Sequence, residues 1–130
     1  MRIYLAGPMR GYPAFNFPRF HREAQLLRSM GHTVLSPAEE DEANGFEPEG
    51  MTGNENLADL GFNLRQALAY DLDYICNDAE AVVVLPRWHQ SSGAKAEVAT
   101  ARALGIPVLY VSYDGDGTPS LEETPIRAAI

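Results

Sequence analysis

The 130-residue sequence has almost no cysteine, since Cys76 is the only one. A single cysteine cannot form a disulfide within one chain, and such low usage suits a reducing compartment. Histidine is also scarce, and the three residues present do not cluster with each other or with the cysteine. Zinc sites are built from such clusters. The sequence therefore predicts a cytoplasmic protein without a disulfide framework or a metal site.

Basic residues and long apolar runs are lacking as well. Ten Lys and Arg stand against eighteen Asp and Glu, which gives a formal net charge of -8. Binding to nucleic acid requires clustered Lys and Arg, so this balance argues against a nucleic-acid partner. No apolar run is long enough to span a membrane, and the N-terminus enters a strand without a signal segment. A small anionic ligand is still compatible with this acidic composition, because one Arg and a few backbone N–H groups can hold one phosphate.

What the sequence does contain is an alternation of short apolar runs and helical patterns. Strands are expected at 2–6, 33–35, 81–85 and 107–112, and helices at 18–30, 62–76 and 92–104. The run Ala-Val-Val-Val-Leu at 81–85 is typical of a strand that is covered on both faces. This order predicts one α/β domain over residues 1–130. The expected fold is a Rossmann-like (flavodoxin-like) doubly wound parallel sheet of four to five strands, in the order 2-1-3-4.

Two segments give weaker signals. Residues 37–61 are acidic and rich in Gly and Asn, with few large apolar residues. We expect a long loop there, which is either a solvated surface loop or a lid over a site. Residues 113–130 show no clear fifth strand, and an irregular tail or a contact with a partner is expected.

A candidate anion site lies at the start of the third helix. Ligands of such sheets bind beyond the carboxyl ends of the strands. Ser91, Ser92 and Gly93 follow the third strand, and a helix N-terminus offers free N–H groups and a positive dipole end. Glu97 comes about one turn later, on the flank of the inward face. An exposed Glu at this position would only compensate the dipole, whereas an inward carboxylate could act as a nucleophile.

Asp71 is a carboxylate in an apolar place. Helical spacing puts it inside the stripe of Leu64, Leu68, Leu72 and Ile75, whereas Asp73 falls on the solvent side. A buried carboxylate is costly unless it is paired, and buried carboxylates are candidates for catalysis. The alternative is a structural hydrogen-bond acceptor. We favour a functional role for Asp71 and none for Asp73.

The remaining candidates follow the first and third strands. Tyr4, Gly7, Arg10 and Gly11 lie at the end of the first strand; Gly7 would let the backbone approach a ligand, and Arg10 could form a fork with a phosphate. His89 lies in the loop before Ser91, where it could line a pocket.

These pieces, taken in order, resemble the nucleoside 2-deoxyribosyltransferase superfamily. The matching residues are Tyr4-x-x-Gly7-x-x-Arg10-Gly11, Asp71-Leu-Asp-Tyr-Ile, and Ser91-x-Gly93-x-x-x-Glu97 after an apolar strand. The first and last segments are most similar to the deoxynucleoside 5′-monophosphate N-glycosidase branch. The stretch from Leu85 to Glu97, which contains Trp88, is also similar to small phage-associated proteins of that superfamily. The resemblance covers roughly residues 2 to 112.

The resemblance implies a role for each matching residue. Glu97 would be the nucleophile that forms a glycosyl-enzyme, Asp71 would assist at the base, and Tyr4 would lie near the sugar. Ser91, with Gly7, Arg10 and Gly11, would line a phosphate pocket. The implied reaction is cleavage or exchange of the N-glycosidic bond of a nucleoside or its 5′-monophosphate. It needs no cofactor, and the superfamily implies a homodimer or a larger homo-oligomer.

Two other functions fit the same residues. A non-catalytic nucleotide-binding or sensing module would keep the phosphate loops without needing Glu97 or Asp71. A glycohydrolase that acts on NAD would break the nicotinamide ribose bond instead. The pattern alone identifies neither the base and sugar nor the choice between hydrolysis and transfer.

Overall fold

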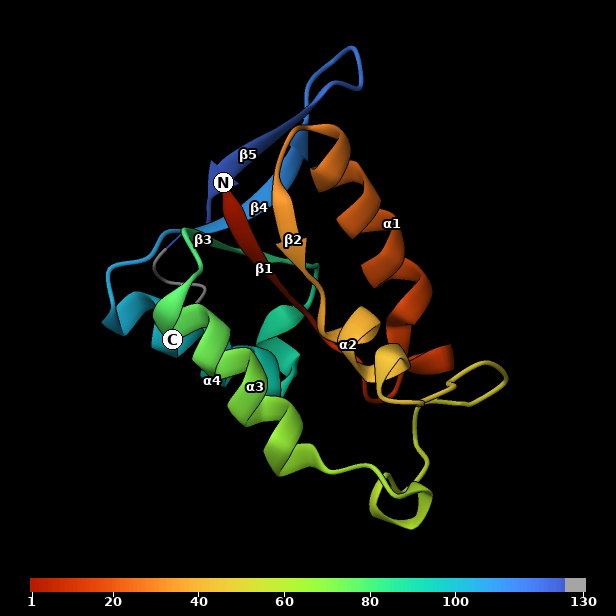
Figure 1. The fold of residues 1–130 in the computed structure, drawn as a ribbon. Helices are drawn as coiled ribbons and strands as arrows, with labels where there is room; N and C mark the ends of the chain where they lie inside the picture. The colour runs from red at the N-terminus through yellow and green to blue at the C-terminus, as the bar shows by residue number, and fades with distance from the viewer. Residues whose placement is uncertain (126–130) are drawn as a thin grey trace.

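The computed structural model describes residues 1–125, which form an α/β domain around one five-stranded sheet (Figure 1). The strands are β1 (Arg2–Ala6), β2 (Thr33–Leu35), β3 (Ala81–Val84), β4 (Val108–Tyr113) and β5 (Pro119–Glu123). Their order in the sheet is β2-β1-β3-β4-β5. The first four strands run parallel, and β5 pairs antiparallel with β4. The predicted Rossmann-like α/β fold and the order of its first four strands are confirmed.

Within residues 1–125, four α-helices surround the sheet. They are α1 (Phe17–Ser29), α2 (Pro37–Ala43), α3 (Leu64–Asn77) and α4 (Ser92–Ala103). Helix α1 covers one face, α3 and α4 cover the other, and α2 lies near the end of β2 (Figure 1). Short 3-10 turns stand at Pro13–Asn16, Ala58–Leu60 and Trp88–Gln90. None of the helices in residues 1–125 has the length and apolar content needed to cross a bilayer.

The sheet separates two apolar cores, because side chains alternate along each strand. Ile3 and Leu5 of β1 point into the core beneath α1. Tyr4 and Ala6 point into the core beneath α3 and α4, together with Val82 of β3. Burial on both faces explains why the β3 sequence is an uninterrupted apolar run. The register of β1 therefore delivers the Tyr4 side chain to the α3 and α4 side.

Residues 37–61 were expected to be a long loop, and this is wrong for the first seven of them, which form α2. Ser36 is extended, and Pro37 stands in the first turn, where its fixed φ and missing N–H cost nothing. The acidic residues Glu39 and Glu40 also lie in that turn, where they complement the helix dipole. Part of the acidic pattern therefore marks a helix start.

The later part of this segment crosses over the loop between β1 and α1. We call residues 50–57 the strap. Gly11 N–H donates to the Gly53 carbonyl at 2.8 Å, and Ala14 N–H donates to the Met51 carbonyl at 2.8 Å. The strap is thus attached to the opposite loop by backbone hydrogen bonds.

The expectation of an irregular segment after residue 113 is also wrong, since Pro119–Glu123 form the edge strand β5. The Asp114 carboxylate accepts hydrogen bonds from the N–H groups of Asp116 and Thr118, at 2.8 and 2.9 Å. This turn folds β5 back onto β4. Pro119 is tolerated because it is the first residue of an edge strand. Residues 126–130, the end of the expected tail, lie outside the described residues.

Candidate functional site

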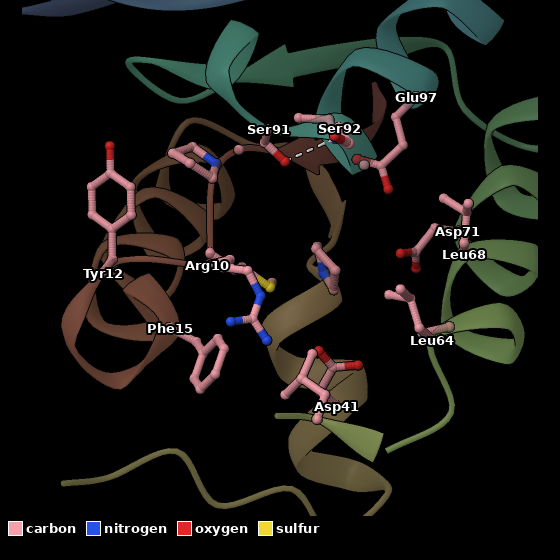
Figure 2. A pocket seen from close by; sticks show the side chains of 18 of the residues that line it. Arg10, Tyr12, Phe15, Asp41, Leu64, Leu68, Asp71, Ser91, Ser92 and Glu97 are labelled. Carbon is pink, nitrogen blue, oxygen red and sulfur yellow. Dashed lines mark hydrogen bonds between the residues drawn. The ribbon is translucent and has the colours of Figure 1, made fainter. Parts of the chain in front are cut away.

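The main candidate site is a cavity of about 510 Å³ at the carboxyl ends of β1 and β3. Figure 2 shows its side chains converging from the β1–α1 loop, α2, α3 and the start of α4. This is where doubly wound sheets bind ligands, and the volume is in the range of small-molecule pockets. Seven of the residues singled out from the sequence line it: Gly7, Arg10, Asp71, Ser91, Ser92, Gly93 and Glu97.

Glu97 lies inside the protein and points into this pocket. Its side chain is 6% exposed, and it shares the inner face of α4 with Ala94, Val98 and Ala101. The fully buried Tyr4 hydroxyl donates a hydrogen bond to Glu97 Oε2 at 2.7 Å. The inward position expected from helical spacing is therefore confirmed. Tyr4 stands behind the carboxylate rather than in the pocket lining.

Asp71 lies on the inner face of α3, as its spacing predicts. It is 8% exposed, and Ile75 is buried one turn later, whereas Asp73 is exposed. Asp71 and Glu97 come from neighbouring helices and line the same cavity (Figure 2). Two buried carboxyl groups on a shared wall are costly when both are ionised.

Burial changes the protonation of this cluster. It raises the pKa of Glu97 to about 8, helped by the charge of Asp71 and opposed by the hydrogen bond from Tyr4. Burial also raises the pKa of Asp71 to about 6. The Tyr4 pKa lies well above its usual value, first through burial and then through the two carboxylates, so its hydroxyl remains a donor. Near pH 7 the carboxyl pair thus holds one proton.

The first turn of α4 forms the polar end of the pocket. Ser91 precedes the helix, and its Oγ accepts a hydrogen bond from the Ala94 N–H at 3.2 Å. The first N–H groups of a helix have no intrahelical acceptor. The Ser91 side chain accepts the hydrogen bond of the Ala94 N–H group. The N–H groups of Ser92 and Gly93 are left for an anionic ligand.

The β1–α1 loop forms the adjoining wall. Position 7 has to be a glycine, because a Cβ atom there would lie 2.8 Å from the side chain of Leu85. The Arg10 guanidinium donates to the Glu55 carbonyl of the strap and lies 6.0 Å from the ring centre of Phe15. The Arg10 guanidinium therefore lies at the end of the pocket that Phe15 lines.

Besides Tyr4, three residues singled out from the sequence lie outside the lining of this pocket. Gly11 has a φ of +88° and serves the backbone contact with Gly53 in the strap. Trp88 is buried in the core beneath α3 and α4, which also contains Ala94. His89 is exposed, and its ring meets the Trp88 ring edge-on.

Sequence reasoning left open whether residues 37–61 cover a site, and it named none of the residues from 37–62 that line the cavity. Asp41, Phe46, Leu57 and Phe62 all line the cavity. The available signal was Ser36-Pro37, a typical helix start, which would have put residues 37 and 41 on one helical face. The positions of the aromatic rings depend on how the strap folds back, and no local pattern reports that.

The carboxylates of the site do not form a metal-binding group. Among residues 1–125, no set of three His, Cys, Asp or Glu side chains is arranged so that it could hold a metal ion. What the cavity offers is a shared proton, a tyrosine hydroxyl and a helix N-terminus.

Comparison with known proteins places the chain in a family. No curated protein matches the sequence. A family model described as a domain of unknown function, DUF4406, matches residues 1–110, and that range contains Tyr4, Asp71 and Glu97. Because this match spans most of the 130 residues, the chain belongs to the DUF4406 family.

Proposed function

We propose that this protein cleaves or exchanges the N-glycosidic bond of a nucleoside or (deoxy)nucleoside 5′-monophosphate, through a covalent glycosyl intermediate on Glu97. The observation that carries the proposal is the buried hydrogen bond from Tyr4 to Glu97, beside Asp71, in a cavity that ends at a helix N-terminus. The resemblance to the nucleoside 2-deoxyribosyltransferase superfamily supports it. Together these features supply a nucleophile, an acid and an anion site.

The first step breaks the bond to the base. Without substrate, the higher pKa of Glu97 holds the shared proton mainly on Glu97. Transfer of that proton to Asp71 gives a Glu97 carboxylate, which the Tyr4 hydroxyl stabilises. This carboxylate attacks the anomeric carbon; the carbon–nitrogen bond breaks, its electron pair goes to the base nitrogen, and Asp71 protonates the base.

The second step releases the sugar. Asp71, now ionised, takes a proton from water while the water oxygen attacks the anomeric carbon. The bond from that carbon to Glu97 breaks, and its electron pair returns to the carboxylate. If a second base takes the place of water, the same step gives transfer instead of hydrolysis. Both outcomes restore the starting protonation of the pair.

The polar end of the pocket suits a 5′-phosphate. The N–H groups of Ser92 and Gly93 lie at the positive end of the α4 dipole, and Ser91 adds a hydroxyl group. Arg10 on the neighbouring loop is a cation that lines the same cavity, and it would have to turn from Phe15 and the Glu55 carbonyl to reach a phosphate there. We also propose that the protein is cytoplasmic and forms a homodimer or larger homo-oligomer. The exposed Leu64 and Tyr70 of α3 support the association, because a second subunit could cover them.

The decisive experiment is base release by a Glu97→Gln variant. Chromatography of nucleosides and 5′-monophosphates, incubated with and without an acceptor base, should show a free base with the wild type. Glu97→Gln should lower the rate by about a thousandfold or more, because an amide cannot act as the nucleophile. The glutamine oxygen still accepts the Tyr4 hydrogen bond, so the fold should be kept.

Matched aspartates on α3 provide the control. Asp71→Asn should lower kcat strongly, whereas Asp73→Asn changes an exposed residue of the same helix and should leave kcat unchanged. Full activity of Glu97→Gln would refute the assignment. Binding of nucleotides without any product would favour a sensing module, and release of nicotinamide from NAD alone would favour a glycohydrolase of that type.

A further inference from the structure

Asp41 is a third carboxyl group in the pocket, and the reaction described above does not use it. It lies in α2, one helical turn after Pro37, and both residues line the cavity. Figure 2 shows its carboxyl group directed into the same space as those of Asp71 and Glu97. The α4 end of the pocket, with Ser91 and Ser92, lies on the opposite side in this view.

The Asp41 carboxyl group has no partner within residues 1–125. No side chain or backbone group there donates a hydrogen bond to it, and no cation pairs with it. Burial, followed by the charges of Asp71 and Glu40, raises its pKa to about 7. A half-buried acceptor without a donor is costly, and a ligand with N–H groups would remove that cost.

Aromatic rings surround the same end of the pocket. Phe46 packs against Phe62 with ring centres 5.3 Å apart, and against Phe15 and Phe17 at 5.6 and 5.8 Å. All four line the cavity with Asp41. Flat apolar walls with one polar group at the edge suit a flat heterocycle, since the walls hold its faces and the polar group reads its rim.

The outer surroundings add negative charge. A second hollow, of about 840 Å³, shares Asp41, Phe46, Phe62, Ala67 and Asp71 with the first. Glu40 and Glu47 also line it. The carboxyl groups around the aromatic end accept hydrogen bonds when ionised and donate none. The Arg10 guanidinium, 6.0 Å from the Phe15 ring centre, already donates to the Glu55 carbonyl. The groups at this end that still lack a partner are therefore acceptors, and the rim of the ligand there should present N–H groups rather than carbonyl oxygens.

We propose that Asp41 selects the base, by accepting a hydrogen bond from an exocyclic amino group, so that amino-bearing bases such as cytosine or adenine are preferred over their oxo counterparts. This inference rests on the proposed function. An oxo group at the same place would set carbonyl lone pairs against carboxylate lone pairs. An asparagine at position 41 would accept both kinds of base, because its amide can turn to donate or to accept.

The test compares substrate pairs that differ between amino and oxo forms. These are deoxycytidine and deoxyuridine monophosphates, and deoxyadenosine and deoxyinosine monophosphates. At pH 8, wild-type kcat/KM should favour the amino member of at least one pair by about tenfold or more. Asp41→Asn should bring that ratio close to one, mainly by improving the oxo substrate. Glu49→Gln, an exposed carboxyl in the same acidic segment, should leave the ratio unchanged.

Calorimetric binding of the same four nucleotides separates this inference from the proposed function. If no base is released but the amino nucleotides bind more tightly, and Asp41→Asn removes that preference, Asp41 is the selector and the proposed reaction is wrong. If bases are released and the ratio is the same in wild type and Asp41→Asn, the reaction stands and the selector is refuted. If nothing binds or reacts, both are overturned.

Discussion

Single residues of this site differ in how far the sequence predicts them. Glu97 and Asp71 are predictable, because helical periodicity is a local property that shows which side chains face inward. Tyr4 is less so, since its contact with Glu97 joins positions 93 apart in the sequence. Asp41 could not be predicted as a site residue, because its place depends on the docking of α2. The spacing of apolar residues along a helix predicts which side chains are buried, whereas tertiary packing determines which residues those side chains contact.

The shared proton of Glu97 and Asp71 predicts a bell-shaped dependence of kcat on pH. Below about pH 6 both carboxyl groups are protonated, so the proposed nucleophile is lost. Above about pH 8 both are ionised, so no acid remains for the base. Measuring kcat with a nucleoside from pH 5 to 9.5 checks this, because a nucleoside has no phosphate that titrates there. A flat profile across this range would contradict a shared proton.

At the scale of elements, the strongly apolar parts were predictable and the pieces held by irregular contacts were not. Strands β1 to β4 and helices α1, α3 and α4 stand where apolar patterns predict them. Edge strand β5 is mostly exposed, so its sequence shows little apolar alternation. The strap has no regular pattern at all. It is held by close backbone contacts with a loop in which Ala14, Phe15 and Asn16 all have positive φ.

The strap predicts unequal effects of two glycine substitutions. Gly53 has a φ of +95°, and a Cβ there would lie 2.1 Å from the Tyr12 carbonyl oxygen. Gly53→Ala should therefore lower the free energy of unfolding by about 2 kcal/mol or more, or detach the strap. Gly50 also has a positive φ, of +82°, but faces open space. Gly50→Ala should cost only about 1 kcal/mol.

Urea unfolding of both variants and limited proteolysis of the strap provide the measurement. Faster cleavage within residues 50–57 in Gly53→Ala, but not in Gly50→Ala, is the expected pattern. Equal losses of stability with equal cleavage would show that backbone conformation, rather than the contact with Tyr12, sets the effect.

The whole molecule carries acidic groups inside as well as outside. Its formal charge is -8, and the carboxyl groups of Asp41, Asp71 and Glu97 line one pocket. Asp41, Asp71 and Glu97 all have pKa values raised by burial. The folded protein therefore binds more protons than the unfolded chain between about pH 4.5 and 8. Its free energy of unfolding should fall as the pH rises through this range.

Glu97→Gln should make the fold more stable at alkaline pH. The stability that a raised pKa contributes is fully present below the ordinary pKa of 4.5 and is lost as the pH rises through about 8. The variant has no charge to bury, so at pH 8.5 it should gain about 1–3 kcal/mol over the wild type. At pH 4.5 the difference should be small.

Urea titrations of both proteins at these two pH values provide the check, with Glu49→Gln as an exposed control. A variant that is less stable than the wild type at pH 8.5 would argue against the cost of the buried charge. A gain at pH 8.5 together with lost activity would place the destabilising group and the reactive group at the same residue.

The alternation of side chains along β1 has a consequence for measuring how well the protein has folded. Ile3 and Leu5 face one core and Tyr4 faces the other, so a slip of one residue would turn the phenol away from Glu97. Such a slipped chain would keep its helices and strands, and its circular dichroism would look nearly normal. The Tyr4–Glu97 bond would be missing, however. For the proposed reaction, turnover would therefore report strand alignment sensitively, and the fraction of active molecules would equal the fraction whose first strand is correctly paired.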